Sequence, residues 1–281
     1  MTPSVPFHEV PETTFAYTKE APLFHQQVRH IHFYAGNEKG EKDLPDYVRR
    51  YGQEPLEKAD VIVALGGDGT MLDAMKMAYP FDIPVYGIDR GGEGYLLNSE
   101  PTDLISEIYH AAVVPFPALD CSGVDVKKHP FHHICLNDVA TRCETSQTAH
   151  IRITLNDVVY RDEVWCNSVI VATPQGSTGY CRWADGMVIP VGCRQLSIAG
   201  VAQIKTKAPG INATVDEQTR IQIEALDTEK RPQSLDCDNV TEMHFKRCLI
   251  QKAPQMVRVL YNPTHQVVRH AIFAQRILSR A

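Results

Sequence analysis

The chain has 281 residues, of which 43% are hydrophobic and 22% are charged, and its formal net charge is -6 at pH 7. This length and composition are typical of a globular protein with one large domain or two moderate ones. The acidic balance argues against a nucleic-acid backbone or an anionic membrane as the main partner, so we expect neither. Any phosphate group must then be bound by a local feature of the chain.

The first residues combine prolines with Glu9 and Glu12 and contain no sustained apolar core. This pattern predicts neither a signal peptide nor a membrane span, and we therefore expect a cytoplasmic location. The eight cysteines include no Cys-x-x-Cys pair, which favours reduced, mostly buried thiols over a zinc site or a redox dithiol.

The first part of the chain predicts an α/β domain. Residues 1–27 are rich in Pro, Thr and Glu and predict an irregular extension, whereas residues 28–115 alternate apolar runs with amphipathic segments. Such alternation is typical of a parallel sheet with helices on its faces. In chain order we expect a strand at 30–34, a helix at 45–53, a strand at 61–65, a helix at 71–77, a strand at 84–88 and a helix at 102–112.

The second part predicts a mainly β domain. A Pro-containing link at 115–117 marks the boundary, and residues 116–268 contain short β-rich runs separated by turn signals. We expect residues 269–281 to return to the first domain. The expected strands lie at 133–139, 150–155, 169–173, 221–226 and 256–260.

A glycine turn stands between the predicted strand at 61–65 and the predicted helix at 71–77. It reads Gly66-Gly67-Asp68-Gly69-Thr70. Glycines let backbone amides approach a phosphate closely at a helix N-terminus, and Asp68 adds a carboxylate that can act as a base or a metal ligand. The turn matches neither the dinucleotide fingerprint nor the Walker loop. A plain strand-to-helix turn capped by Asp68 is the alternative.

Two further glycine clusters follow β-rich runs. The first covers residues 87–95 and follows the next strand of the same predicted sheet, so we expect both loops at one edge. Tyr95, at its end, is either an adenine-stacking ring or a packing residue. The second covers residues 173–180, where Ser177 and Thr178 offer hydroxyls to a ribose or a phosphate. Its spacing does not match the serine-nucleophile elbow.

Together with Asn137-Asp138, these clusters resemble the NAD kinase family in their order and approximate spacing. The family carries a GGDGT turn, a Gly-Ile-Asn-x-Gly-x-Leu-Gly-Phe loop, an Asn-Glu pair and a Thr-Pro-x-Gly-Ser-Thr-Ala-Tyr segment. The turn is shared with diacylglycerol, sphingosine and sugar kinases, and the segment at 173–180 favours NAD kinase. The resemblance covers about residues 28–275 and implies a two-domain fold of the NAD kinase and diacylglycerol kinase type.

The resemblance implies that the chain phosphorylates the 2′-hydroxyl of the adenosine ribose of NAD to give NADP. The donor would be ATP, or polyphosphate in some members, with Mg²⁺ at a site that we leave unassigned. It further implies a homodimer or homotetramer. Asp68 would be the catalytic carboxylate, which fits a transfer that needs chiefly positioning and charge neutralisation. The residues that it implies in nucleotide and substrate binding are Gly67, Gly69, Thr70, Leu72, Tyr95, Asn137, Asp138, Asn167, Thr178, Gly179 and Tyr180.

The chain departs from the family pattern at several positions near the ligand. Asp89 replaces asparagine, Asp138 replaces glutamate and Gly179 replaces alanine. Asn167 stands where the family has a carboxylate, and Trp183 stands where it has serine, either filling the core or contacting the ligand. Two alternatives therefore stay open: a kinase of a lipid or sugar hydroxyl, and a non-catalytic nucleotide-binding relative.

Overall fold

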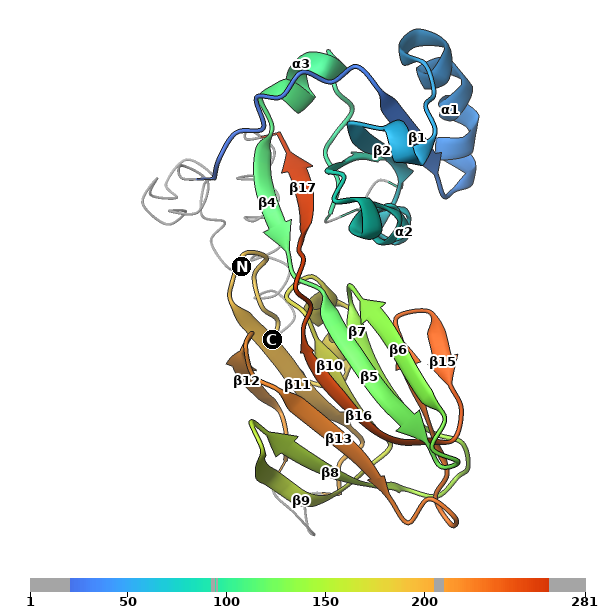
Figure 1. The fold of residues 1–281 in the computed structure, drawn as a ribbon, viewed down its shortest axis with the longest axis vertical. Coiled ribbons are helices and arrows are strands. Elements are labelled where there is room, and N and C mark those ends of the chain that lie inside the picture. Colours follow the sequence, from blue (N-terminus) through green and yellow to red (C-terminus); the bar gives the residue numbers. More distant parts are fainter. Residues whose placement is uncertain (1–20, 92–93, 95, 205–209, 263–281) are drawn as a thin grey trace, which may run out of the picture. The chain divides into compact units, whose positions relative to one another are not determined.

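The computed structural model describes residues 21–91, 94, 96–204 and 210–262. Its described residues form two compact units, one of residues 21–114 and 258–262 and the other of residues 115–257. Figure 1 labels most of their helices and strands.

The first unit is built on a five-stranded sheet in the order β1-β2-β3-β17-β4. Strands β1, β2 and β3 are parallel neighbours, and β17 pairs with β3 in parallel. The strands are β1 (Ile31–Ala35), β2 (Val61–Gly66), β3 (Val85–Asp89), β4 (Ala112–Phe116) and β17 (Val257–Tyr261). The helices are α1 (Glu38–Tyr51), α2 (Asp68–Ala78) and α3 (Leu104–Tyr109), with short 3₁₀ turns at Leu56–Lys58 and Tyr79–Phe81.

The alternation predicted for this unit is present, with shifted helix ends. All six residues of β2 are buried, as expected for a central parallel strand. Helix α1 begins earlier than predicted because Asn37 caps it, its side chain accepting from the Gly40 amide at 2.8 Å. Pro45, the predicted start, lies inside the helix. Helix α3 is shorter than predicted because Asp103 caps its start and β4 begins at Ala112.

The last described strand, β17, belongs to the first sheet, where Val259 pairs with Val85. The predicted division had assigned residues 116–268 to the mainly β domain. A short β-rich run shows that a strand forms but not which sheet it joins, so the sequence could not locate this return. The predicted segment 269–281 lies outside the described residues, as do residues 1–20.

The second unit contains two six-stranded sheets, in the orders β12-β11-β10-β7-β14-β15 and β6-β5-β16-β13-β8-β9. All strand pairs recorded within them are antiparallel. The first sheet comprises β7 (Asp138–Cys143), β10 (Ser168–Ala172), β11 (Gln195–Val201), β12 (Ala213–Asp216), β14 (Gln233–Cys237) and β15 (Val240–Glu242). The second comprises β5 (Leu119–Asp125), β6 (Pro130–Cys135), β8 (Ala149–Leu155), β9 (Val158–Cys166), β13 (Ile221–Leu226) and β16 (Phe245–Lys252).

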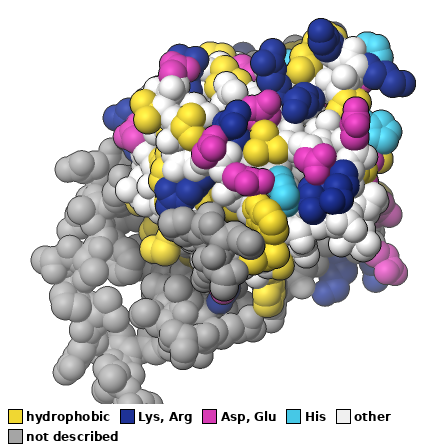
Figure 2. All heavy atoms as spheres, turned by 90° about the horizontal axis from the view of Figure 1, so that it is seen from below, with side chains coloured by type: hydrophobic (Ala, Val, Ile, Leu, Met, Phe, Trp, Pro, Cys, Tyr) yellow, Lys and Arg dark blue, Asp and Glu magenta, His cyan; other side chains and the backbone are white. Residues whose placement is uncertain are grey.

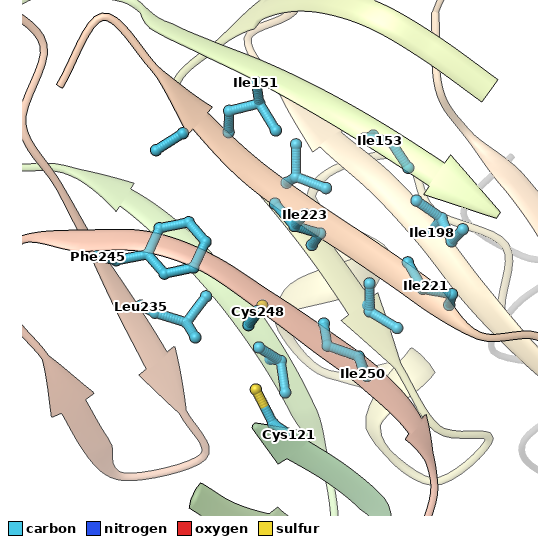
Figure 3. Packing of buried hydrophobic residues seen from close by; sticks show 14 of the residues in the cluster. Cys121, Ile151, Ile153, Ile198, Ile221, Ile223, Leu235, Phe245, Cys248 and Ile250 are labelled. Atoms are coloured by element: carbon cyan, nitrogen blue, oxygen red, sulfur yellow. The ribbon is translucent and has the colours of Figure 1, made fainter. Parts of the chain in front are cut away.

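Side chains from both sheets form one apolar core in this unit. Ile198 and Leu235 come from the first sheet, and Ile221, Ile223 and Phe245 come from the second (Figure 3). In β13 the buried residues alternate along the strand, which gives this segment its period-two patterning. The other face of the first sheet is covered by the short helix α4 (Tyr180–Trp183), which packs through Cys181.

All eight cysteines are free, and six of them are buried, as predicted. No helix in the described part of the chain is long and apolar enough to cross a membrane. On the face seen in Figure 2, basic and acidic side chains are intermixed. On the sheet that contains β8 and β13, Arg152 pairs with both Asp162 and Glu224.

Candidate functional site

The carboxyl ends of three parallel strands meet at one edge of the first unit. The register of β2 with β3 places Gly66 beside Asp89, and the Arg90 amide donates to the Gly66 carbonyl at 2.7 Å. On the other side, a methyl group added at Gly36 would lie 2.6 Å from the Thr70 Oγ1. The two glycine loops therefore share this edge, as predicted from their positions after neighbouring strands.

The glycines of the GGDGT turn serve different purposes. A methyl group at Gly66 would lie 2.1 Å from the Thr70 Oγ1, so Gly66 is required by the packing of Thr70. At Gly67 and Gly69 an added methyl group would meet nothing within 4 Å. Gly67 caps α2, and these two glycines border the open space in front of its N-terminus. Thr70 is 5% exposed, so its backbone rather than its side chain is available to a ligand.

Asp68 is the first residue of α2, and its Oδ1 accepts from the Leu96 amide at 2.9 Å. The second carboxylate of this edge, Asp89, lies close by. A methyl group added at Gly94 would be 3.2 Å from the Asp68 Oδ1 and 3.7 Å from the Asp89 Cγ. Gly94 thus leaves room for two carboxylates to approach the same point.

Asp89, which replaces the family's asparagine, has both carboxylate oxygens engaged by its own loop. Oδ1 accepts from the Gly91 amide at 2.8 Å and Oδ2 from the Gly94 amide at 3.4 Å. An asparagine has only one acceptor oxygen and could hold only one of these amides. The substitution therefore adds a contact within the loop as well as a charge at the edge.

No motif in the sequence predicts the charge network around Arg90. Its guanidinium is 12% exposed and pairs with Asp43 at 2.7 Å and with Glu100, and it donates to the Tyr47 hydroxyl at 3.0 Å. Partial burial acts to raise the pKa of Glu100, but the hydrogen bonds from Arg90 and Tyr47 outweigh it and lower that pKa. The network ties the loop after β3 to α1.

The other two residues of this unit that were predicted to bind ligand are Tyr95 and Leu72. Tyr95 lies outside the described residues. Leu72 is half-buried on α2, one turn after Asp68, so it lies beside the turn and not within it.

In the second unit, Asn137 lies directly before β7 and Asp138 is the first residue of that strand. The side chain of Asp238 binds the backbone of both. Its carboxylate accepts from the amides of Leu136, Asn137 and Asp138 at 2.8, 2.9 and 3.2 Å. This explains why the run predicted at 133–139 is two strands, β6 and β7, because the amides between them bond to a side chain. The sequence signal was faint: an Asp-Cys-Asp triplet at 236–238.

The segment that begins at Thr173 is packed against Asn137. The Thr173 amide and hydroxyl both donate to the Asn137 carbonyl, at 2.9 and 3.0 Å. A methyl group at Gly176 would lie 2.0 Å from the same carbonyl, so no side chain fits there. Gln175 adds hydrogen bonds to the carbonyls of Leu136 and Pro117. Asn137, Asp138 and residues 173–178 are therefore one rigid cluster.

The hydroxyls of this segment are used internally. Ser177 is fully buried; its Oγ donates to the Pro174 carbonyl at 2.6 Å and accepts from the Ile189 amide at 2.8 Å. The prediction that Ser177 offers its hydroxyl to a ligand is therefore wrong, because the hydroxyl is buried and hydrogen-bonded to backbone groups of Pro174 and Ile189. The half-buried Thr178 donates to the Gln175 carbonyl at 3.1 Å and keeps an acceptor lone pair.

Two aromatic side chains after this segment are exposed. Tyr180 and Trp183 are 46% and 78% exposed, whereas Gly179 is half-buried. Core filling, one of the two interpretations of Trp183, is therefore wrong; α4 is only one turn long and presents Cys181, not Trp183, to the sheet.

Asn167 is not part of the cluster. It precedes β10, whereas Thr173 follows it, so the two lie about 20 Å apart along the strand direction. Asn167 is exposed, its amide donates to the Val201 carbonyl, and its carbonyl accepts from the Cys143 thiol. Within this unit the predicted nucleotide-binding set is thus divided between the two ends of one strand.

The edge with Asp68 and Asp89 offers the type of ligand that Mg²⁺ prefers. Mg²⁺ is commonly held by one or two carboxylates together with substrate phosphates. Two carboxylates converge near Gly94 beside a phosphate-type turn, so the residues fit such an ion. The described residues contain no group of three or more His, Cys, Asp or Glu side chains that could hold a metal alone.

Comparison with known proteins gives a consistent result. The family model for the ATP-NAD kinase N-terminal domain matches residues 15–112. The chain is 31% identical over 238 residues to an NAD kinase of Hyphomonas neptunium, which covers 84% of this chain and 93% of the relative. An NAD kinase of Brucella suis is 32% identical over 238 residues, covering 84% and 92%.

Solved structures share the fold. Yeast NADH kinase complexed with NADH superposes with a TM-score of 0.75 at 13% identity, covering 84% of each chain. An NAD kinase from Archaeoglobus fulgidus in complex with ATP gives a TM-score of 0.66 at 22% identity, covering 83% of this chain and 94% of that one. Both have an α/β unit joined to a mainly β unit in common with this chain.

Proposed function

The chain belongs to the NAD kinase family, and we infer from this that it transfers a phosphoryl group to the 2′-hydroxyl of the adenosine ribose of NAD, giving NADP. The relatives that match most of its length are NAD kinases, which favours NAD over a lipid or sugar hydroxyl. The observation that carries the proposal is Asp68, a carboxylate on the first turn of α2 between two glycines that border open space.

We propose that Asp68 accepts the proton of the attacking hydroxyl. Its Oδ1 is oriented by the Leu96 amide, which fixes the carboxylate without neutralising it. A carboxylate placed by a backbone amide can orient a hydroxyl at little entropic cost, and phosphoryl transfer needs little more than such positioning and charge neutralisation. The amides at Gly67, Gly69 and Thr70 would hold phosphate oxygens at the helix N-terminus.

We propose ATP as the donor, with inorganic polyphosphate as the alternative, and Mg²⁺ as the accompanying ion. Asp89 would hold the ion together with phosphate oxygens of the donor, and the ion when bound would neutralise charge on those oxygens. Asp68, which also approaches Gly94, would act as the base and not as a ligand.

We further propose that three residues of this cluster, Asn137, Asp138 and Thr178, contact the dinucleotide. Gly179 and Tyr180, which follow the cluster, would contact it too. The support is the rigidity of the cluster: Asp238 and Thr173 hold the backbone of Asn137, so the side chains start from a defined geometry. The exposed rings of Tyr180 and Trp183 suit stacking on a base or a nicotinamide. Asn167 would contact ligand independently of this cluster, and assembly into a dimer or tetramer stays a proposal.

The test is a direct assay of product. Purified full-length protein is incubated with NAD, Mg²⁺ and either ATP or polyphosphate, and NADP is detected through a dehydrogenase that accepts only the 2′-phosphorylated cofactor. Formation of NADP that depends on all components is the expected result. Absence of NADP, together with an NAD-induced rise in melting temperature, would instead favour the non-catalytic relative.

A further inference from the structure

A pocket lined by three basic and two acidic side chains lies in the first unit. It encloses about 410 Å³ and is lined by Lys39, Lys42, Asp43, Asp89 and Arg90. Because these residues come from α1 and from the loop after β3, the pocket opens at the same strand edge as Asp68.

The position of α1 fixes the two lysines at this edge. A methyl group at Gly40 would lie 2.2 Å from the Leu65 carbonyl, so the first turn of α1 sits directly on the end of β2. Lys39 and Lys42 flank this contact and are three residues apart, which places them as neighbours on the helix surface. Both side chains are exposed.

The charges in the pocket are unevenly compensated. Arg90 is paired with Asp43 and Glu100, and the Asp89 carboxylate accepts from the amides of its loop. By contrast, no ion pair recorded for the described residues involves Lys39 or Lys42. Two cationic charges therefore line the pocket without an acidic side chain paired to them there.

The loop that begins at the pocket also contacts the catalytic turn. The Asp89 loop reaches the turn at Gly91, where an added methyl group would lie 3.7 Å from the Gly67 Cα. A ligand with several linked anionic groups could therefore extend from the amides of Gly67 and Gly69 to the lysines. A single small anion could not span this distance.

We propose that Lys39 and Lys42 bind the distal part of a polyphosphate chain, whose reacting phosphoryl group lies at the GGDGT turn. This inference rests on the proposed function, since the chain would be that of the phosphoryl donor. ATP and inorganic polyphosphate both contain a chain of linked phosphates. The compact ammonium group of a lysine, on its flexible stem, can pair with the phosphates of either ligand.

The experiment measures binding and turnover in K39Q/K42Q and in a control of equal charge change, K58Q/K127Q. Lys58 and Lys127 are exposed and lie outside the pocket. Binding of tripolyphosphate and of ATP is followed by calorimetry with Mg²⁺, and KM is measured for donor and for NAD. We expect the donor Kd and KM to rise about 10-fold in K39Q/K42Q, as for two exposed charge contacts, while the KM for NAD and both control values change less than 2-fold.

The outcomes separate the two claims. If K39Q/K42Q binds both ligands as tightly as the control does, the pocket assignment is overturned even though NADP is formed. If the wild type binds tripolyphosphate through the lysines but forms no NADP, the pocket stands and the proposed function fails. Lysine-dependent binding of ATP alone supports the pocket and identifies a nucleotide donor, and binding of both ligands supports it for either donor.

Discussion

Asp238 is the residue whose removal tests the substrate cluster most sharply. In D238N one carboxylate oxygen becomes an amide NH₂, which cannot accept a hydrogen bond. If the remaining oxygen keeps the amides of Asn137 and Asp138, the NH₂ faces the Leu136 amide, donor against donor. Leu136 is 1% exposed, so its amide gains little compensation from water. Loss of one charge-assisted bond and the unpaired donor together predict a destabilisation of about 2–3 kcal/mol.

Tryptophan fluorescence reports this loss, because both tryptophans, Trp165 and Trp183, lie in the second unit. Urea unfolding followed by this signal gives the free energy of unfolding of that unit. The matched control is D236N: Asp236 is on the same segment, but it accepts from the Thr241 hydroxyl near the surface, so we expect a change below about 1 kcal/mol. We also expect the KM for NAD to rise in D238N. A D238N protein within about 0.5 kcal/mol of the wild type would refute the role assigned to this carboxylate.

Three other predictions follow from contacts of the same kind. G176A should lower the free energy of unfolding of the second unit by about 2–3 kcal/mol, since its methyl group has no space beside Asn137. G179A, whose methyl group would lie 3.3 Å from the Gly176 carbonyl, should lower it by less, and equal effects would contradict the packing. G69A should stabilise α2 by up to about 1 kcal/mol, because alanine favours a helix, yet reduce kcat/KM at least about 10-fold by obstructing phosphate approach; an unchanged kcat/KM would remove Gly69 from the site. Burial acts to raise the pKa of Glu217, but Lys252 and Arg194 outweigh burial and lower that pKa. The ionised carboxylate therefore stabilises the fold above its ordinary pKa, and this stabilisation is lost as acid protonates the group. E217Q should be less stable than the wild type at neutral pH and should lose less stability on acidification, measured by urea unfolding at pH 7 and pH 4.

Local features of the site could be predicted from the sequence, because neighbouring residues determine them. The apolar run at 61–65 followed by glycines predicts a strand that ends in a turn and a helix, and β2 and α2 follow this pattern. The shared edge of the two glycine loops follows from the order of strands in a parallel sheet.

Features that depend on distant residues could not be predicted in this way. Asp238 supports amides about one hundred residues earlier, and Arg90 joins Asp43 to Glu100. The return of β17 to the first sheet depends on pairing with β3, which no local pattern encodes. Asn167 and Thr173 are six residues apart in the sequence, but β10 lies between them and separates them in space.

The D68N variant tests most directly whether Asp68 is the catalytic carboxylate of this NAD kinase family member. Asparagine can still accept from the Leu96 amide through its side-chain oxygen, so the turn should keep its structure. NADP formation is measured at saturating NAD, ATP and Mg²⁺, with the melting temperature as the check on folding. If Asp68 is the general base, we expect kcat to fall by about 10²–10⁴-fold in D68N at an unchanged melting temperature. A folded D68N protein that forms NADP at the wild-type rate would contradict it.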